Sequence, residues 1–187
     1  MAMIKVVNNA YYDYDKDVQN VLNYVLTSKD VVGNYISSHL VYNIGIPSVV
    51  QQMKLTATQL GKNKGRVIQH LIISFDDYYE SFVDDSFAYE IVSRFMRSAF
   101  GSFQWIFGIH RNSKGNLHAH AIINNVNLQT GKKINTYNDT MEILCQELLF
   151  ASLGNLKKCF HSYGRQKSWD KSLRLVPFSI SIFYISL

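Results

Sequence analysis

Residues 104–124 read QWIFGIHRNSKGNLHAHAIIN, two apolar segments separated by a polar stretch that contains a glycine. Each apolar segment has the length and composition of a β-strand, so we expect strands over 104–110 and 117–124 that pair as an antiparallel hairpin. His118 and His120 are two residues apart and therefore share a face of their strand. In this hairpin His110 falls opposite His118, which brings three imidazoles onto one face of the sheet.

Three neutral imidazoles in this arrangement suit a divalent cation, because they leave coordination positions open for a substrate oxygen or water. Imidazole by itself favours Zn, Cu or Ni, whereas a phosphate substrate and cellular abundance favour Mg or Mn. We therefore expect His110, His118 and His120 to hold a divalent metal ion, Mg²⁺ or Mn²⁺, with Zn²⁺ or Ni²⁺ as substitutes in a crystal. Gly108 on the same face would leave room for the ion. The competing interpretation is a solvent-facing His-x-His pair without a metal.

The rest of the chain mixes helical and strand patterns without βαβ alternation. This order favours an α+β fold, a single domain with a mainly antiparallel central sheet and helices packed on one face. The helix at 84–99 is expected on the sheet face opposite the histidines. Residues 1–173 are expected to form the domain and residues 174–187 an apolar tail. The N-terminal half is expected to contain a strand at 3–7, a helix over 18–26 capped by Asp15 or Asp17, a loop with short extended pieces at 33–45, and a helix from Pro47 to Gly61. A strand at 67–75, helices at 84–99 and 140–153, and a strand-like tail are expected to follow.

Composition limits the class of protein. The 187 residues suit one domain, and 47% hydrophobic with 18% charged residues excludes a disordered chain. The net charge of +5 permits a polyanionic partner, and the bases gather in the acid-free stretches 54–66 and 111–133. No apolar run approaches the ~20 residues that cross a bilayer, and two cysteines are too few for a disulfide scaffold. The bacterial cytoplasm is the expected location.

His110, His118 and His120, with apolar residues and Asn124 following, resemble the His-hydrophobe-His motif of the HUH endonucleases. Further segments, in this order, resemble plasmid or conjugative mobilisation relaxases of the MobA type over roughly residues 3–150. They are the helix 21–29 with its tyrosine, the strand 67–75 with a histidine before Ser74-Phe75, and Gly131-Lys132-Lys133. Relatives are commonly longer, so the chain is expected to be a compact relaxase or a fragment.

The resemblance implies a relaxase nuclease domain that nicks one DNA strand at a transfer origin by metal-dependent transesterification. Tyr24 would be the nucleophile and would stay linked to the 5′ phosphate. The implied partners are single-stranded DNA at an origin of transfer, accessory mobilisation proteins and a coupling protein, without membrane insertion. Tyr11, Tyr12 and Tyr14 are rival candidates for the nucleophile, or base-stacking residues.

Two positions depart from the pattern of such relaxases. Asn112 stands where they often have Asp, and it can accept a hydrogen bond but adds no charge. Asn116 stands where many have another His.

Basic and polar side chains supply the candidate DNA contacts, and their sum should make binding salt-dependent. His70 and Ser74 share a strand face and would touch DNA or support the site, or else form a satisfied buried pair. The candidate DNA-binding residues are Lys62, Lys64, Arg66, His70, Ser74, Arg111, Lys132 and Lys133.

Two different functions fit the same histidine motif. A rolling-circle replication initiator or HUH transposase would use a tyrosine C-terminal to the histidines, Tyr137 or Tyr163. A non-catalytic single-stranded DNA-binding module would bind DNA without nicking it.

Overall fold

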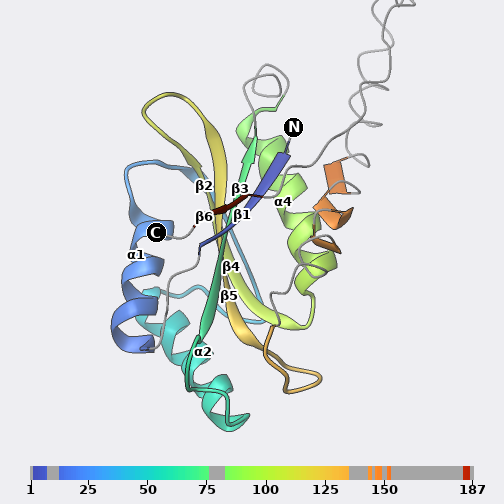
Figure 1. Ribbon diagram of the computed structural model, residues 1–187. Coiled ribbons are helices and arrows are strands. Elements are labelled where there is room, and N and C mark those ends of the chain that lie inside the picture. The colour runs from blue at the N-terminus through green and yellow to red at the C-terminus, as the bar shows by residue number, and fades with distance from the viewer. Residues whose placement is uncertain are drawn as a thin grey trace, which may run out of the picture.

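A six-stranded sheet forms the centre of the computed structural model (Figure 1), in the order β2-β4-β5-β3-β1-β6. All neighbours are antiparallel except β1 and β6, which are parallel. The structure describes residues 2–7, 13–75, 83–134, 143–144, 146–148, 151–152 and 183–185. The strands are β1 (Ala2–Val7), β2 (Val31–His39), β3 (Ile68–Phe75), β4 (Phe103–Arg111), β5 (Leu117–Asn127) and β6 (Phe183–Ile185).

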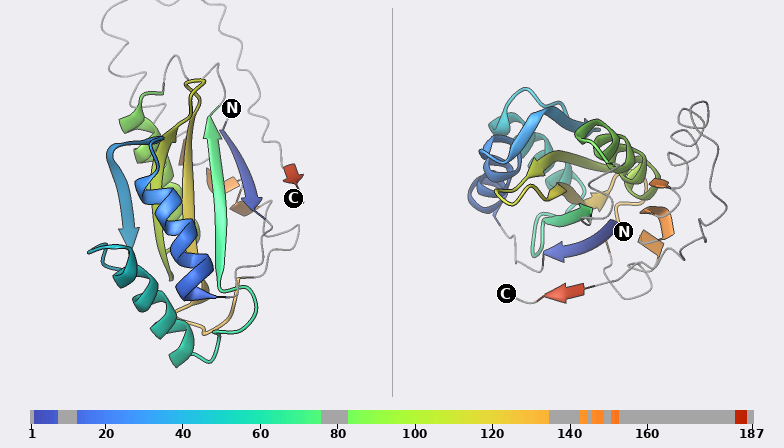
Figure 2. Two further views of the ribbon diagram at one scale, coloured as in Figure 1. Left: turned by 90° about the vertical axis from the view of Figure 1, so that its left-hand side faces the viewer. Right: turned by 90° about the horizontal axis from the view of Figure 1, so that it is seen from above.

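Helices cover both faces of this sheet (Figure 2). The π-helical turn η1 (Tyr14–Val18), α1 (Gln19–Thr27) and α2 (Ile46–Gln59) pack on one face, and α4 (Asp85–Phe100) packs on the other. The expected α+β class with a mainly antiparallel sheet is confirmed. The expectation of helices on one face is wrong in this detail, because the central strands β4 and β5 are apolar on both faces and each face needs a cover.

The two cores divide the alternating residues of the strands between them. Leu117, Ala119, Ala121 and Ile123 of β5 point toward α4, where Phe95 is fully buried. The α4 stripe that the sequence predicted, Phe87, Ile91, Val92 and Phe95, thus lies on the sheet face opposite the histidines, as expected. The second core, beneath α1 and α2, includes Val18, Leu22, Val25, Val49, Val50, Met53, Ile106 and Ile122.

Strand β2 is longer than the short extended pieces that were expected within the loop over residues 33–45. It is an edge strand that pairs only with β4 among the described strands, and its register shifts between Val31 and Ile36. Gly33, inside this irregular part, has a φ of +48°. An irregular edge strand has no clean alternation of apolar residues, which is why the sequence pattern indicated a loop.

Smaller corrections concern the ends of elements. Asp13 caps the first helical segment, by accepting a hydrogen bond from the backbone N–H of Lys16, so the expected caps Asp15 and Asp17 lie inside the helical turn. The helix expected over 140–153 lies partly outside the described residues, but 143–144, 146–148 and 151–152 are helical. Within the expected tail, residues 183–185 form β6. Among the helices of the described ranges, none is long and apolar enough to cross a bilayer.

Candidate active site

Strand register brings the three predicted histidines together at one end of the sheet. His110 of β4 is directly opposite His118 of β5, and Gly108 is opposite His120. The ring centroids of His110 and His120 are 4.7 Å apart, and those of His118 and His120 are 5.0 Å apart. The predicted convergence of the three imidazoles on one sheet face is confirmed.

His110 has a fixed orientation because one ring nitrogen is bound by the end of a helix. Its Nε2 lies 2.8 Å from the backbone oxygen of Val25, in the last turn of α1. A carbonyl oxygen only accepts, so Nε2 carries the proton and Nδ1 carries a lone pair. This Nδ1 is buried and has no hydrogen-bond partner within the described residues, and the His110 residue is 0% exposed. A buried nitrogen without a hydrogen-bond partner destabilises the folded protein, unless a ligand binds to its lone pair.

The remaining two imidazoles are oriented in the same way. His118 Nδ1 lies 3.2 Å from the carbonyl oxygen of Asn116, and His120 Nδ1 lies 2.8 Å from Nε2 of His70. These contacts leave Nε2 of His118 and Nε2 of His120 for a ligand. Metal-binding histidines usually have such a partner on the second nitrogen, which fixes the tautomer and the ring angle.

The electrostatics of the cluster favour neutral rings. Burial lowers the pKa of His120, and the neighbouring histidines lower it further. Burial is also the main cause of the lowered pKa of His110, and burial followed by the nearby His110 lowers the pKa of His70 to about 4. Neutral imidazole is the form that binds metals, so His110 and His120 are in their ligand form at neutral pH.

The donor set fits a divalent metal ion. His110, His118 and His120 each offer one nitrogen, and these three nitrogens lie within 4.8 Å of one another. The buried lone pair of His110 points to the same conclusion, because nothing in the described chain satisfies it. Three nitrogen ligands leave coordination positions for oxygen atoms of a substrate.

Tyr24 of α1 lies against this cluster. Its ring centroid is 5.1 Å from that of His120, edge to face, and 5.6 Å from that of His110. The residue is 46% exposed, although its ring contacts the two imidazoles. A tyrosine beside a candidate metal site and open to solvent has the placement that the nucleophile of a phosphoryl transfer needs.

Tyr14, a rival candidate for the nucleophile, has a different environment. It is 5% exposed, and its hydroxyl donates a 2.8 Å hydrogen bond to Oδ1 of Asn124 in the core beneath α2. Burial raises its pKa. Four further tyrosines that the sequence offered as nucleophiles lie outside the described residues: Tyr11, Tyr12, Tyr137 and Tyr163.

Gly108 makes the contact between α1 and the sheet possible. A Cβ atom at this position would lie 2.7 Å from the Val25 carbonyl oxygen, and only 3.7 Å from Nε2 of His110. The missing side chain therefore makes room for the helix backbone. The expected room for an ion at this position stays a prediction. A glycine within an apolar strand is a known sign of close backbone approach, and it was the available sequence signal for this contact.

The hairpin between β4 and β5 is held by Asn112 and Arg111. Asn112 Oδ1 accepts from the backbone N–H groups of Lys114 and Asn116, both at 3.0 Å. An amide oxygen fills this acceptor role as well as a carboxylate would, so the Asp-to-Asn departure costs no turn contact. Arg111 donates to Asp85 of α4 and to the Gly115 carbonyl, both at 2.7 Å. Its guanidinium thus connects the hairpin to α4, which covers the sheet face opposite the histidines.

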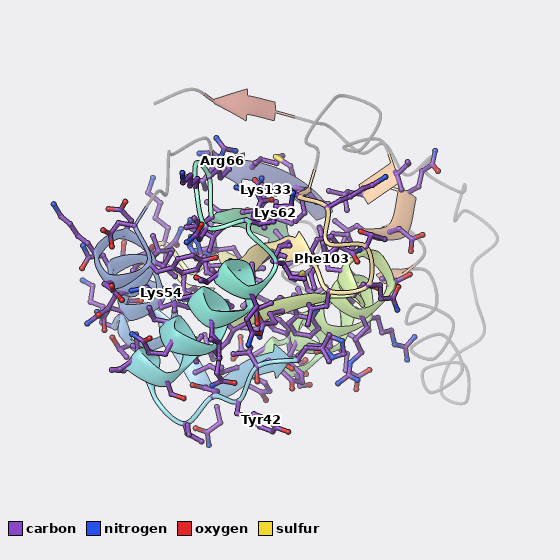
Figure 3. All side chains as sticks on the ribbon, turned by 90° about the horizontal axis from the view of Figure 1, so that it is seen from below. Tyr42, Lys54, Lys62, Arg66, Phe103 and Lys133 are labelled. Carbon is purple, nitrogen blue, oxygen red and sulfur yellow. The ribbon has the colours of Figure 1, made fainter. Side chains whose placement is uncertain are left out.

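Most of the predicted basic DNA contacts lie at the far end of the sheet from the histidines. Lys62, Arg66 and Lys133 gather beside the end of α2 (Figure 3). The Lys133 ammonium donates to the carbonyl oxygens of Lys64 and Arg66, the latter at 3.0 Å. From His120 to Asn127 the β5 strand extends about 24 Å, so this group is remote from the histidines. Exposed Lys132 precedes Lys133 in the segment that follows β5.

His70 and Ser74 share the histidine face of β3, as their spacing suggested. Ser74 is directly opposite His118 and is half-buried, whereas His70 is 6% exposed and is bound to His120. The sequence could not reveal the His70–His120 contact, because it depends on β3 and β5 being neighbours.

The chain matches the model of a known protein family over most of its length. The family model described as "Relaxase: MobA/VirD2-like, nuclease domain" matches residues 24–149, from Tyr24 through all three histidines. No curated protein matches the chain.

Proposed function

The chain belongs to the MobA/VirD2-like relaxase nuclease family, and on this premise we propose that it nicks one DNA strand by tyrosine transesterification during plasmid mobilisation. The family match confirms the resemblance that the histidine motif gave. A nuclease domain of this family is a DNA-nicking enzyme that binds single-stranded DNA and uses a divalent metal ion. The proposal of tyrosine transesterification rests on the contact of the exposed Tyr24 ring with His110 and His120.

In the proposed reaction the Tyr24 oxygen attacks a phosphorus atom of the DNA backbone. A bond forms between the phenolic oxygen and phosphorus, and the bond from phosphorus to the 3′ oxygen breaks. The phenol loses its proton and the leaving 3′ oxygen gains one, so the products are a 5′-phosphotyrosyl link and a 3′ hydroxyl. Reversal of the same step rejoins the strand, because the new ester conserves the phosphodiester bond.

His110, His118 and His120 would hold the ion, through Nδ1 of the first and Nε2 of the following two. A bound divalent cation, Mg²⁺ or Mn²⁺ in the cell, would supply positive charge for the phosphate oxygens. The protein groups do the positioning: α1 presents Tyr24, and the Val25 carbonyl fixes His110. Ser74, which lies opposite His118, would contact DNA near the reacting phosphate.

We propose that the DNA also contacts the basic group at the far end of the sheet. Lys62, Lys64, Arg66, Lys132 and Lys133 would bind phosphates about 24 Å from the histidines, several nucleotides from the nick. These contacts add affinity without base recognition. The proposed setting is an origin of transfer in the bacterial cytoplasm, with accessory mobilisation proteins and a coupling protein as further partners.

Covalent capture tests the nucleophile. The protein is incubated with Mn²⁺ and a library of random single-stranded oligonucleotides, and denaturation-resistant adducts are isolated and mapped by peptide mass. We expect the DNA on Tyr24 and no adduct with Tyr24→Phe, while Tyr42→Phe, a matched change at an exposed tyrosine away from the site, keeps the wild-type yield. An adduct on Tyr163 would instead indicate a replication initiator or transposase.

A second variant tests the histidine cluster. His120→Ala should abolish adduct formation and keep most of the DNA affinity, since the affinity comes mainly from basic side chains. Fluorescence anisotropy with a labelled single strand measures the affinity. Normal cleavage by this variant in the presence of Mn²⁺ would contradict the proposed metal centre, and DNA binding without any adduct in the wild type would favour the non-catalytic binding module.

A further inference from the structure

We propose that His70 is a positioning residue for the metal ligand His120: its Nε2 accepts the Nδ1–H of His120 and so holds the His120 Nε2 lone pair toward His110 and His118. The inference rests on the proposed metal centre and deepens it.

The contact is short, buried and built into the sheet. His70 Nε2 and His120 Nδ1 are 2.8 Å apart, with the two rings tilted by 45°. His70 is paired with Ile122 in the β3–β5 register, and His120 with Ile72, so the two histidines are diagonal neighbours on one face. Their exposed fractions are 6% and 5%. Water therefore competes little for this hydrogen bond.

The direction of the hydrogen bond follows from the rest of the cluster. If His70 donated, the single proton of neutral His120 would be on Nε2, directed toward the ligand position. An Nε2–H there would place a donor among the ligand nitrogens, which lie within 4.8 Å of one another. His110 Nδ1, one of these nitrogens, has no hydrogen-bond partner among the described residues. With His70 as the acceptor, the nitrogens facing the centre of the cluster all carry lone pairs, as a metal requires.

A neutral imidazole in this place has a chemical consequence. Metal-binding histidines are often oriented by a carboxylate, which adds negative charge to the site. His70 fixes the tautomer without adding charge. More of the charge of a divalent ion is then available to the phosphate oxygens of DNA.

The test compares variants that keep or remove the acceptor. In His70→Gln the side-chain amide oxygen can still accept from His120, whereas His70→Leu has an apolar side chain and no acceptor. His39→Leu is the matched control, because His39 also has an imidazole bound to a carbonyl, that of Gly101, and it stacks on Trp105 away from the site. Mn²⁺ affinity of the full chain is measured by calorimetry, and the tautomer of His120 by ¹⁵N NMR of the metal-free protein.

We expect His70→Leu to bind Mn²⁺ about 10–100-fold more weakly, the usual effect of losing such a partner. His70→Gln should restore most of the affinity, and His39→Leu should bind like the wild type. The NMR spectrum of the wild type should show His120 protonated on Nδ1. Because the spectrum needs only wild-type protein, it tests the proposal even if His70→Leu does not fold.

Two results would overturn the inference while leaving the metal centre in place. The first is a His70→Leu variant that binds Mn²⁺ as tightly as the wild type, while His120→Ala no longer binds it. The second is an NMR spectrum of the wild-type protein that shows His120 protonated on Nε2. A wild-type protein that binds no Mn²⁺ would be a failure of the proposed metal centre instead, and the tautomer of His120 would still decide the role of His70.

Discussion

Replacing Gly108 with alanine should move α1 away from the histidines and disable the site without removing any of its functional groups. The new Cβ would lie 2.7 Å from the Val25 carbonyl oxygen, about 0.7 Å inside the distance at which ordinary van der Waals contact begins. The obstacle is backbone at both ends, so side-chain rotation cannot relieve it. The helix has to shift by several tenths of an ångström.

This shift would act on two parts of the site. The hydrogen bond from His110 Nε2 to the Val25 oxygen, now 2.8 Å, would lengthen toward the limit of about 3.5 Å. Leaving that buried N–H unsatisfied costs about 1–3 kcal/mol, and the overpacking adds a similar amount. Tyr24 precedes Val25 and moves with it, and a misplacement of about 1 Å can reduce a rate 10²-fold.

We therefore expect Gly108→Ala to fold, to unfold at a lower denaturant concentration, and to form the covalent adduct about 10–100-fold more slowly. Gly101→Ala is the matched control, since its Cβ would meet the Arg97 carbonyl oxygen at the same 2.7 Å, at the end of α4 away from the site. The control should lose stability but keep its adduct rate per folded molecule. Wild-type rates and wild-type Mn²⁺ affinity in Gly108→Ala would refute the coupling of α1 to His110.

Three further predictions concern stability. Ile91→Asp should unfold the domain, because it buries an unpaired charge in the core beneath α4; circular dichroism with a wild-type melting temperature would contradict the helix placement. Asn112→Asp should keep the hairpin contacts, whereas Asn112→Ala should lose about 1–3 kcal/mol in urea unfolding, and equal stability of the two variants would exclude the turn role. The free energy of unfolding of the metal-free protein should fall as the pH falls below about 6.5. In the unfolded chain His70 and His120 bind protons at that pH, whereas in the folded protein burial lowers their pKa values and they stay neutral. Each such group contributes at most about 1.4 kcal/mol per pH unit, and a free energy of unfolding that rises toward pH 5 would contradict the sign.

Features that depend on residues close together in the chain could be predicted from the sequence. Strand alternation and a short connection are local properties, so the two strands and their three converging histidines followed from spacing alone. The apolar stripe of α4 likewise specified its buried face, including Ile91 and Phe95. The assignment of Tyr24 as the nucleophile came from the family resemblance and stays a prediction. The structure shows that the Tyr24 ring lies beside that of His120.

The groups from distant parts of the chain that contact these residues could not be predicted, because their positions depend on the tertiary fold. His70 and His120 are 50 positions apart, and their contact requires β3 to lie next to β5. The Val25 carbonyl is 85 positions from His110, and it is available because α1 ends there and leaves the oxygen without a helical partner. The covering of both sheet faces was also decided at this level. Such contacts depend on strand order and on where a helix ends in space, and no short sequence pattern records either.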